Sequence, residues 1–350
     1  MATPLSNPPV PMLAKSVAVL PEPDSVPGGF GYEPKWDGFR GIVTYDGESI
    51  EITSRGSKPL TRYFPELVET FESQLTEPCV LDGEIVVRHG TPGRERLDWD
   101  ALSQRIHPAA SRIQTLSRET PASFIAFDLI ERGEQSLIEQ AFADRRRSLV
   151  DLLGGAASPL HISQLTQDVE TARRWLVEFE GAGLDGVLAK PLAAPYSPGK
   201  RVMLKVKHHR SADVVVLGYR LHTSGDGVGS LLLGLYDDSG ELRSVGGASA
   251  FTARRRLELV AELEHAVMRG SDGAVVTGEG ERSRFSSGKD VSFVRLEPRI
   301  VAEVRYDQME GSRFRHTVQF DRWRPDRDAR SCTFDQLETP VAYDLGDVLA

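Results

Sequence analysis

The hexapeptide Lys35-Trp36-Asp37-Gly38-Phe39-Arg40 combines a candidate nucleophile with groups that could serve it. A lysine amine attacks phosphorus only when it is neutral or held in line with a leaving group, so it needs nearby cations and a metal-binding carboxylate. Arg40 is one such cation, Asp37 is the carboxylate, and Gly38 allows close approach of the backbone. The same spacing also suits an ordinary turn with a solvated lysine. Taken alone, the hexapeptide leaves both interpretations open.

Five further segments follow in order, each with a charged or aromatic group in or beside an expected strand. They are Ser54-Arg55-Gly56 after the alternating run 49–53, Val80–Val87, Phe124–Ile130, Leu184–Lys190 and Leu204–Lys207. Gly83 and Glu84 stand at the centre of their strand, where both are costly unless a ligand approaches. Alternation places Lys205 and Lys207 on one face of a strand, and two like charges side by side need an anion.

These six motifs resemble those of the covalent nucleotidyltransferases, which include ATP-dependent DNA ligases, RNA ligases and mRNA capping enzymes. The hexapeptide is similar to motif I, and Leu204–Lys207 to motif V. The segment Phe314–Arg327 looks like motif VI, and its Phe-Arg-His and Arg-Trp-Arg-Pro-Asp sequences are closest to bacterial ligases of repair and end joining. These are the ligase module of ligase D and the stand-alone actinobacterial ligase C. Ligase C is the better match, because no polymerase or nuclease module is attached.

The resemblance implies a DNA ligase that seals nicks between a 3′-hydroxyl and a 5′-phosphate in three steps. Lys35 would attack the α-phosphate of ATP to form lysyl-AMP, the AMP would pass to the DNA 5′-phosphate, and the 3′-hydroxyl would displace it. Lys205 and Lys207 would neutralise the α-phosphate, and Asp37 and Asp185 would hold Mg²⁺ or Mn²⁺. The remaining implied contacts are Glu33 with the adenine amino group, Phe127 stacked on adenine, Arg40 and Glu84 at the ribose, Arg55 at the 5′-phosphate of the nick, and Arg322 and Arg324 at the pyrophosphate.

Several of these residues also have simpler interpretations. The family usually has Glu-Gly in motif IV, and Asp185-Gly186 is one methylene shorter, which leaves open whether Asp185 reaches a metal directly or through water. Taken alone, Phe127 is explained equally well as an aromatic residue of the core. Glu33 is explained as a solvated residue of a strand. The run Arg145-Arg146-Arg147 favours the solvated face of a helix.

The pattern of expected elements predicts two domains. Segment 28–207 mixes short strands with helices at 63–75 and 167–181, which indicates an α+β nucleotidyltransferase (adenylation) domain over residues 1–207, with antiparallel sheets and flanking helices. After Lys207 the chain reads as strands and turns with one helix, which suits an all-β OB-fold barrel over residues 208–350. The strands expected there are 212–221, 230–236, 242–245, 300–306 and 317–322, and the helix is 252–268.

Composition limits the cell compartment and the partners. Cys79 and Cys332 are the two cysteines, too few for a disulfide framework or a zinc site of four cysteines, and each is expected to be a small buried residue. The sequence has no apolar stretch long enough to span a membrane, so a cytoplasmic location is expected. The protein is also expected to be a monomer. The net charge of -9 is unusual for a DNA-binding protein, but basic runs at 200–210 and 295–327 would contact nicked duplex DNA. A separate repair polymerase or end-binding proteins are further expected partners.

Two rival functions use the same motifs. An RNA ligase or an mRNA-capping enzyme shares the lysine chemistry, and labelling with ATP and GTP separately would distinguish a capping enzyme. A non-catalytic nucleic-acid-binding protein would be expected to have lost Lys35 or a motif V lysine, and the chain keeps both. An NAD-dependent ligase carries a cysteine zinc finger, which two cysteines cannot build.

Overall fold

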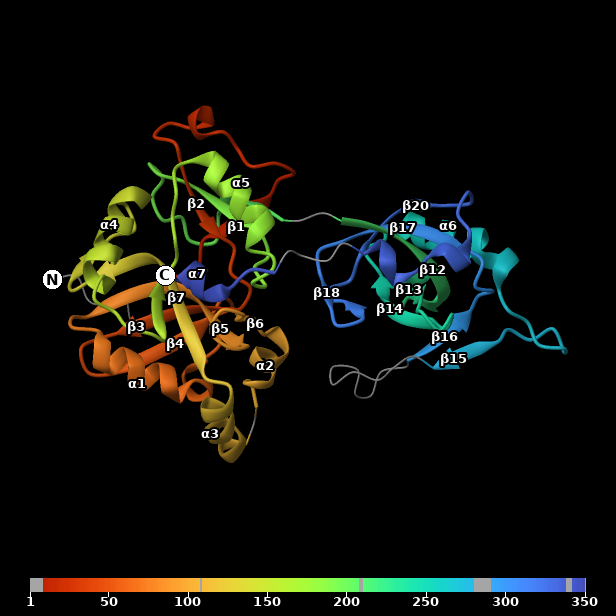
Figure 1. Ribbon diagram of the computed structural model, residues 1–350, viewed down its shortest axis with the longest axis horizontal. Coiled ribbons are helices and arrows are strands. Elements are labelled where there is room, and N and C mark those ends of the chain that lie inside the picture. The colour runs from red at the N-terminus through yellow and green to blue at the C-terminus, as the bar shows by residue number, and fades with distance from the viewer. Residues whose placement is uncertain (1–8, 108, 208–209, 280–290, 338–341, 350) are drawn as a thin grey trace. The chain divides into compact units, whose positions relative to one another are not determined.

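The computed structural model describes residues 9–107, 109–207, 210–279, 291–337 and 342–349 (Figure 1). The chain forms two compact units: unit 1 comprises Met1–Lys207 with Pro340–Ala350, and unit 2 comprises His208–Thr339. The second domain expected from the sequence runs to residue 350, whereas the structure groups the chain from Pro340 with unit 1. The physical reason is the burial of apolar side chains, because Leu345 and Val348 are fully buried in a core of unit 1.

Unit 1 is built on two mainly antiparallel sheets. The larger sheet has the order β4-β3-β5-β7-β8, with β6 beside β5 and β9 parallel to β7. Its strands are β3 (Phe39–Tyr45), β4 (Ile50–Ser54), β5 (Cys79–His89), β6 (Arg96–Leu97), β7 (Ala122–Arg132), β8 (Gln135–Ser136) and β9 (Leu160–Ile162). The smaller sheet has the order β1-β11-β10-β2. Its strands are β1 (Leu13–Ser16), β2 (Phe30–Pro34), β10 (Val187–Pro191) and β11 (Arg201–Val206).

Helices cover these sheets, and some of them start at recognisable sequence signals. They are α1 (Pro65–Gln74), α2 (Trp99–Gln104), α3 (Ala110–Glu119), α4 (Phe142–Leu153), α5 (Val169–Glu178) and α7 (Leu345–Leu349), with short 3-10 turns at Pro23–Ser25 and Thr61–Tyr63. Proline in the first turn sets the start of α1, and the Asp168 carboxylate accepts hydrogen bonds from the first backbone amides of α5. Both helices are therefore shorter than the ranges expected from the sequence.

The main core of unit 1 explains one glycine that the sequence links to a ligand. The strands β5 and β7 are buried along almost their whole length, and Phe71 of α1 packs edge-on against Phe124 with ring centroids 5.2 Å apart. A Cβ at Gly83 would lie 2.3 Å from the Phe124 ring. The need for glycine at this position comes from core packing, and the ligand interpretation of Gly83 is wrong.

Unit 2 is an OB-fold centred on the long strand β12 (Arg210–Leu221). β12 pairs antiparallel with β13 (Val228–Tyr236) along one edge, and with β16 (Ser292–Arg295) and β17 (Val301–Tyr306) along the other. The other elements are β14 (Leu242–Ala248), α6 (Ala253–Leu263), β15 (Thr277–Glu279), β18 (Met309–Glu310), β19 (Arg313–Phe314), β20 (Gln319–Trp323), and 3-10 turns at Glu264–Ala266, Ala329–Ser331 and Phe334–Gln336. The expected fold class, α+β followed by an OB-fold, is confirmed.

Candidate active site

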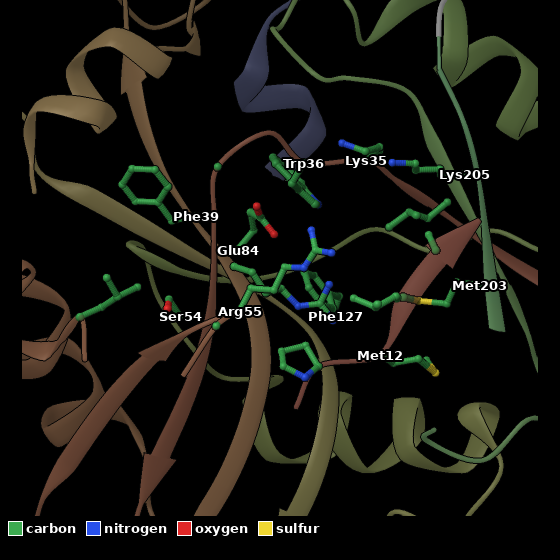
Figure 2. Close-up of a pocket in the computed structure, with 18 of the residues that line it drawn as sticks. Met12, Lys35, Trp36, Phe39, Ser54, Arg55, Glu84, Phe127, Met203 and Lys205 are labelled. Carbon is green, nitrogen blue, oxygen red and sulfur yellow. The ribbon is translucent and has the colours of Figure 1, made fainter. Parts of the chain in front are cut away.

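A cavity of about 670 Å³ in unit 1 gathers residues from both sheets (Figure 2). Its volume suits a nucleotide-sized ligand. Among the described residues its lining has one carboxylate, Glu84, and six cationic side chains: Lys35, Arg40, Arg55, Lys58, Arg201 and Lys205. Phe127 also lines it, whereas Glu33, Asp37, Asp185 and Lys207 do not. The excess of positive charge makes this cavity a site for a polyanion.

Lys35 follows β2 in a turn that two backbone hydrogen bonds hold against the start of β10. The Lys35 amide donates to the Gly186 carbonyl at 2.8 Å, and the Asp185 amide donates to the Lys35 carbonyl at 3.0 Å. A Cβ at Gly38 would lie 2.1 Å from the Ile85 carbonyl oxygen, so only glycine lets the turn approach β5 so closely. The Lys35 amine donates to the Asp185 carboxylate. Asp37 is half-buried in the same turn.

Asp185 is a buried carboxylate shared by two lysines. Its Oδ2 atom bonds the Lys35 amine and lies 2.9 Å from Lys207 Nζ. Burial raises the pKa of Asp185, but Lys35 and Lys207 outweigh that effect and hold the pKa below its usual value. Lys205 lines the cavity instead, and burial together with Lys35 and Lys207 lowers its pKa. The two motif V lysines thus have different neighbours, and Asp185 is the anion beside Lys207.

Two cations lie close to the Phe127 ring, and each is paired with a buried carboxylate. The Arg40 guanidinium carbon is 4.5 Å from the ring centroid, and Lys190 Nζ is 4.6 Å from it. Asp82, which is fully buried, binds Arg40 through both carboxylate oxygens, with Nη2 and Oδ2 2.6 Å apart. The Tyr196 hydroxyl donates to the same Oδ2 at 2.6 Å. The Asp82 and Tyr196 contacts therefore hold Arg40 close to the Phe127 ring.

Glu33 is buried, not solvated, with only 1% of its surface exposed. Its Oε2 lies 2.6 Å from Lys190 Nζ, while Oε1 has no hydrogen-bond partner among the described residues. Burial raises the pKa of Glu33 above its usual value. Arg146 lies 3.7 Å from Oε1, and its own Nη1 is likewise without a hydrogen bond in the described part of the chain. Lys190 and Arg146 therefore neutralise the buried carboxylate from its two oxygens, although the Arg146 contact is too long for a hydrogen bond.

Glu84 is a carboxylate of the cavity whose pKa is changed by burial. Burial raises the pKa of Glu84 to about 7, although Arg40 and Lys35 oppose the rise.

The run Arg145-Arg146-Arg147 differs from the solvated helix face expected from the sequence. Arg145 is fully buried on α4 and forms a fork with Asp128, at 2.8 and 2.9 Å. Arg146 donates to the Ser163 carbonyl, and only Arg147 is well exposed. The solvated-face interpretation of this run is wrong for Arg145, because its charge is neutralised inside the domain.

In unit 2, acidic residues hold the arginines of the motif VI segment. Arg324 Nη1 donates to both oxygens of Asp213 at 3.0 and 3.1 Å, and Arg327 Nε is 3.6 Å from the same carboxylate. Arg322 donates to Glu303 at 2.7 Å. β12, β17 and β20 bring these residues together.

Comparison with known proteins decides the family. Residues 11–207 match the model of the ATP dependent DNA ligase domain, and residues 224–327 match that of the ATP dependent DNA ligase C terminal region. The chain belongs to the ATP-dependent DNA ligases. The ligase is 52% identical over 354 residues to DNA ligase C1 of Mycolicibacterium smegmatis, covering 100% of this chain and 99% of the relative. The expected resemblance to ligase C and the expected ligase activity with ATP are confirmed.

Two further comparisons extend this result. The ligase is 29% identical over 289 residues to the multifunctional non-homologous end joining DNA repair protein LigD of Mycobacterium tuberculosis, covering 80% of this chain and 34% of that protein. A solved Lig E DNA ligase shares the fold, with a TM-score of 0.55 and 16% identity over 89% of this chain and 100% of that one. No helix in the described part of the ligase is long and apolar enough to cross a membrane.

Within the described part of the chain, the site has no preformed cage for a metal ion. No group of three or more histidine, cysteine or acidic residues among the described residues could hold one. Mg²⁺ is commonly bound by one or two carboxylates together with substrate phosphates and water, so the donor set of Asp37 and Asp185 fits such an ion. Asp185 supplies an ionised oxygen, because its pKa is held low.

Sequence reasoning missed three residues that support the cavity. Asp82 and Tyr196 position Arg40, and Lys190 lies behind Phe127, where its amine donates to the Phe127 carbonyl at 3.2 Å. Asp82 and Lys190 each stand as a charged residue within an apolar strand segment. Such a residue predicts a buried, paired charge, because a charge is retained in a core only when it is paired. For Tyr196 the sequence holds no signal.

Proposed function

We propose that the ligase seals nicks in duplex DNA by carrying AMP on Lys35. The observation that supports this most directly is the Lys35 amine at a cavity with six cationic side chains and one carboxylate. Such a lining suits the triphosphate of ATP, and Lys35 is the cation in it whose turn also carries Asp37 and Gly38.

In the first step, Lys35 Nζ forms a bond to the α-phosphorus, the bond from that phosphorus to the bridging oxygen breaks, and pyrophosphate leaves. The ammonium group must first give a proton to water and leave the Asp185 carboxylate that holds it. Lys205 and Lys207 neutralise the α-phosphate as charge builds up. Asp37 and Asp185 would hold Mg²⁺ or Mn²⁺, which would neutralise phosphate charge.

The nucleotide would be recognised by the groups around Phe127. Phe127 stacks on adenine, and Glu33 faces its amino group. Arg40 and Glu84 face the ribose, and Arg55 binds the 5′-phosphate of the nick. Arg322 and Arg324 of unit 2 orient the pyrophosphate in the first step. The acidic partners of these arginines would have to exchange for phosphate at that point.

The setting we propose is DNA repair in the cytoplasm, where the ligase acts as a monomer. The relative named as a non-homologous end joining repair protein supports a repair role. A separate repair polymerase or end-binding proteins would then prepare the DNA ends before sealing.

A labelling experiment tests the assignment of Lys35. The ligase incubated with α-labelled ATP and Mg²⁺ or Mn²⁺ should become covalently labelled, and the label should pass to nicked duplex. Lys35→Ala should abolish labelling, and Lys35→Arg should too, because a guanidinium stays protonated and cannot attack. Lys15→Ala, which changes an exposed lysine of unit 1, is the matched control. Labelling of Lys35→Ala would remove Lys35 as the nucleophile, and labelling by GTP instead of ATP would favour a capping-type enzyme.

A further inference from the structure

The segment 342–349, here called the return segment, is part of the core beneath the Lys35 turn. It follows unit 2 in the sequence yet packs in unit 1, where α7 is labelled in Figure 1. Leu345 and Val348 have 0% exposed surface. The buried residues that share their cluster are Trp36, Val86, Leu97, Ile125, Phe179, Ala182 and Leu184. The return segment therefore completes an apolar core that it does not share with unit 2.

Directional contacts fix the position of the return segment on unit 1. The Leu345 amide donates to the Glu95 carbonyl at 2.9 Å, and the Glu95 amide donates to the Asp344 carboxylate at 3.0 Å. The Tyr343 and Phe179 rings have centroids 5.1 Å apart. Paired hydrogen bonds at one residue, together with buried side chains, give the segment a single register.

The same core reaches both residues of the Lys35–Asp185 ion pair. Trp36 directly follows Lys35, and Leu184 directly precedes Asp185; both are members of the cluster. Trp36 also lines the nucleotide cavity, and its Nε1 donates to the Ser163 hydroxyl at 2.9 Å. The Lys35 and Asp185 backbones are joined by a hydrogen bond of 3.0 Å. A change beneath Trp36 would therefore move the backbone that carries the nucleophile.

We propose that the return segment is a positioning element for Lys35 in self-adenylation, with Leu345 and Val348 acting through Trp36. This inference rests on the proposed role of Lys35 as the nucleophile. Attack on phosphorus requires the amine in line with the leaving group, and a misplacement of about 1 Å can slow such a step by about a hundredfold. Without Leu345 and Val348, the cluster that contains Trp36 and Leu184 loses two fully buried side chains, which weakens the core on which the Lys35 turn rests.

The test separates positioning of Lys35 from the rest of the reaction. Val348→Asp places a charge in the core, while Asp347→Ala changes the exposed neighbour on the same helix and is the control. We expect Val348→Asp to slow self-adenylation with labelled ATP by about tenfold to a hundredfold. Sealing of a nick that already carries 5′-AMP does not use Lys35 as a nucleophile, so its rate should change less than about threefold. Asp347→Ala should match the wild type in both assays.

A second variant guards against a simple loss of folding. The ligase truncated after residue 341 should adenylate slowly, and a synthetic peptide of residues 342–349 should restore the rate in a saturable way. The same peptide with Val348→Asp should not restore it. The proposal is overturned if Val348→Asp adenylates at the wild-type rate, or if both reactions fall together and the peptide restores neither.

The two proposals fail in different ways. If the wild type is not labelled, or if Lys35→Ala still is, then the assignment of Lys35 fails. If labelling depends on Lys35 but not on Val348 or on the peptide, only the role of the return segment fails.

Discussion

At the scale of single residues, Glu84 links the nucleotide cavity to pH. Burial raises its pKa to about 7 in the folded chain, against 4.5 for the same group in water. The folded state therefore holds the Glu84 proton more tightly than the unfolded state. Its contribution to stability is fully present below about pH 4.5, is lost as pH rises through 7, and is constant above that.

Glu84→Gln removes this titration and should change the pH dependence of stability. Relative to the wild type, the variant should gain about 1 to 3 kcal/mol in free energy of unfolding between about pH 5 and pH 8. Denaturant unfolding followed by tryptophan fluorescence measures this, because Trp36, Trp99 and Trp175 all belong to unit 1. An equal difference between variant and wild type at both pH values would show that Glu84 does not titrate in this range.

Residue types predicted the chemistry of the site better than they predicted its contacts. The motifs identify Lys35, Glu84, Phe127 and Lys205, all of which line one cavity. The Lys35–Asp185 ion pair joins positions 150 residues apart, and local sequence carries no information on such a pairing. The same holds for the burial of Glu33, since its partner Lys190 comes from a different strand of the sheet.

At the scale of elements, the pairing of β12, β17 and β20 holds the motif VI arginines in place. Asp213 of β12 is the shared partner of Arg324 and Arg327, and Glu303 of β17 pairs with Arg322. Asp213 accepts from Nη1 of Arg324, while Asp326 accepts from its Nε and Nη2, so two carboxylates together fix the planar guanidinium. The β12 and β17 register, with Asp213 opposite Glu303, makes this arrangement possible.

Asp213→Asn should therefore impair the step in which pyrophosphate leaves. The amide carries no charge to pair with Nη1 of Arg324, so self-adenylation should slow by about tenfold, as expected when a charge-positioning contact is lost. Sealing of pre-adenylated nicks releases no pyrophosphate and should be nearly unchanged. Asp321→Asn, an exposed carboxylate on β20, is the control. Equal losses in both assays would assign Asp213 to stability of the OB-fold instead.

Alternation predicted β17 well, because this strand has one face in a core. It missed β15, β16, β18 and β19, which have four residues or fewer, because so short a run shows no period. The helix expected at 252–268 ends at Leu263 and continues as a 3-10 turn. Helix ends depend on caps and tertiary contacts that a periodic pattern does not contain.

At the scale of the whole molecule, the sequence suggested two domains in succession, and the structure adds the return segment to the first. The sequence of residues 342–349 does not predict that they pack in unit 1, since five helical residues are too few for a clear periodic pattern. Only the complementary cluster around Trp36 explains where Leu345 and Val348 are buried. Contacts between the ends of a chain are decided by tertiary packing and so lie beyond local prediction.

The charge balance of the ligase leads to the last prediction, which concerns binding of DNA. The net charge is -9, and the motif VI arginines 322, 324 and 327 are already paired with acidic residues. Each phosphate that a lysine or arginine neutralises should make the slope of log affinity against log salt steeper by about 0.9. We therefore expect a shallow slope, of magnitude below about 5, and weak binding at physiological salt.

Fluorescence anisotropy of a labelled nicked duplex, with Lys35→Ala to prevent turnover, measures this slope. Arg55→Ala should reduce its magnitude by about 0.9, because one phosphate contact is lost, while Lys15→Ala should leave it unchanged. A slope as steep as about -8 would mean that the acidic partners of the arginines give way to DNA phosphates across much of the protein. In that case the ion pairs seen in unit 2 would be a resting arrangement that DNA replaces, and binding would be governed by their exchange.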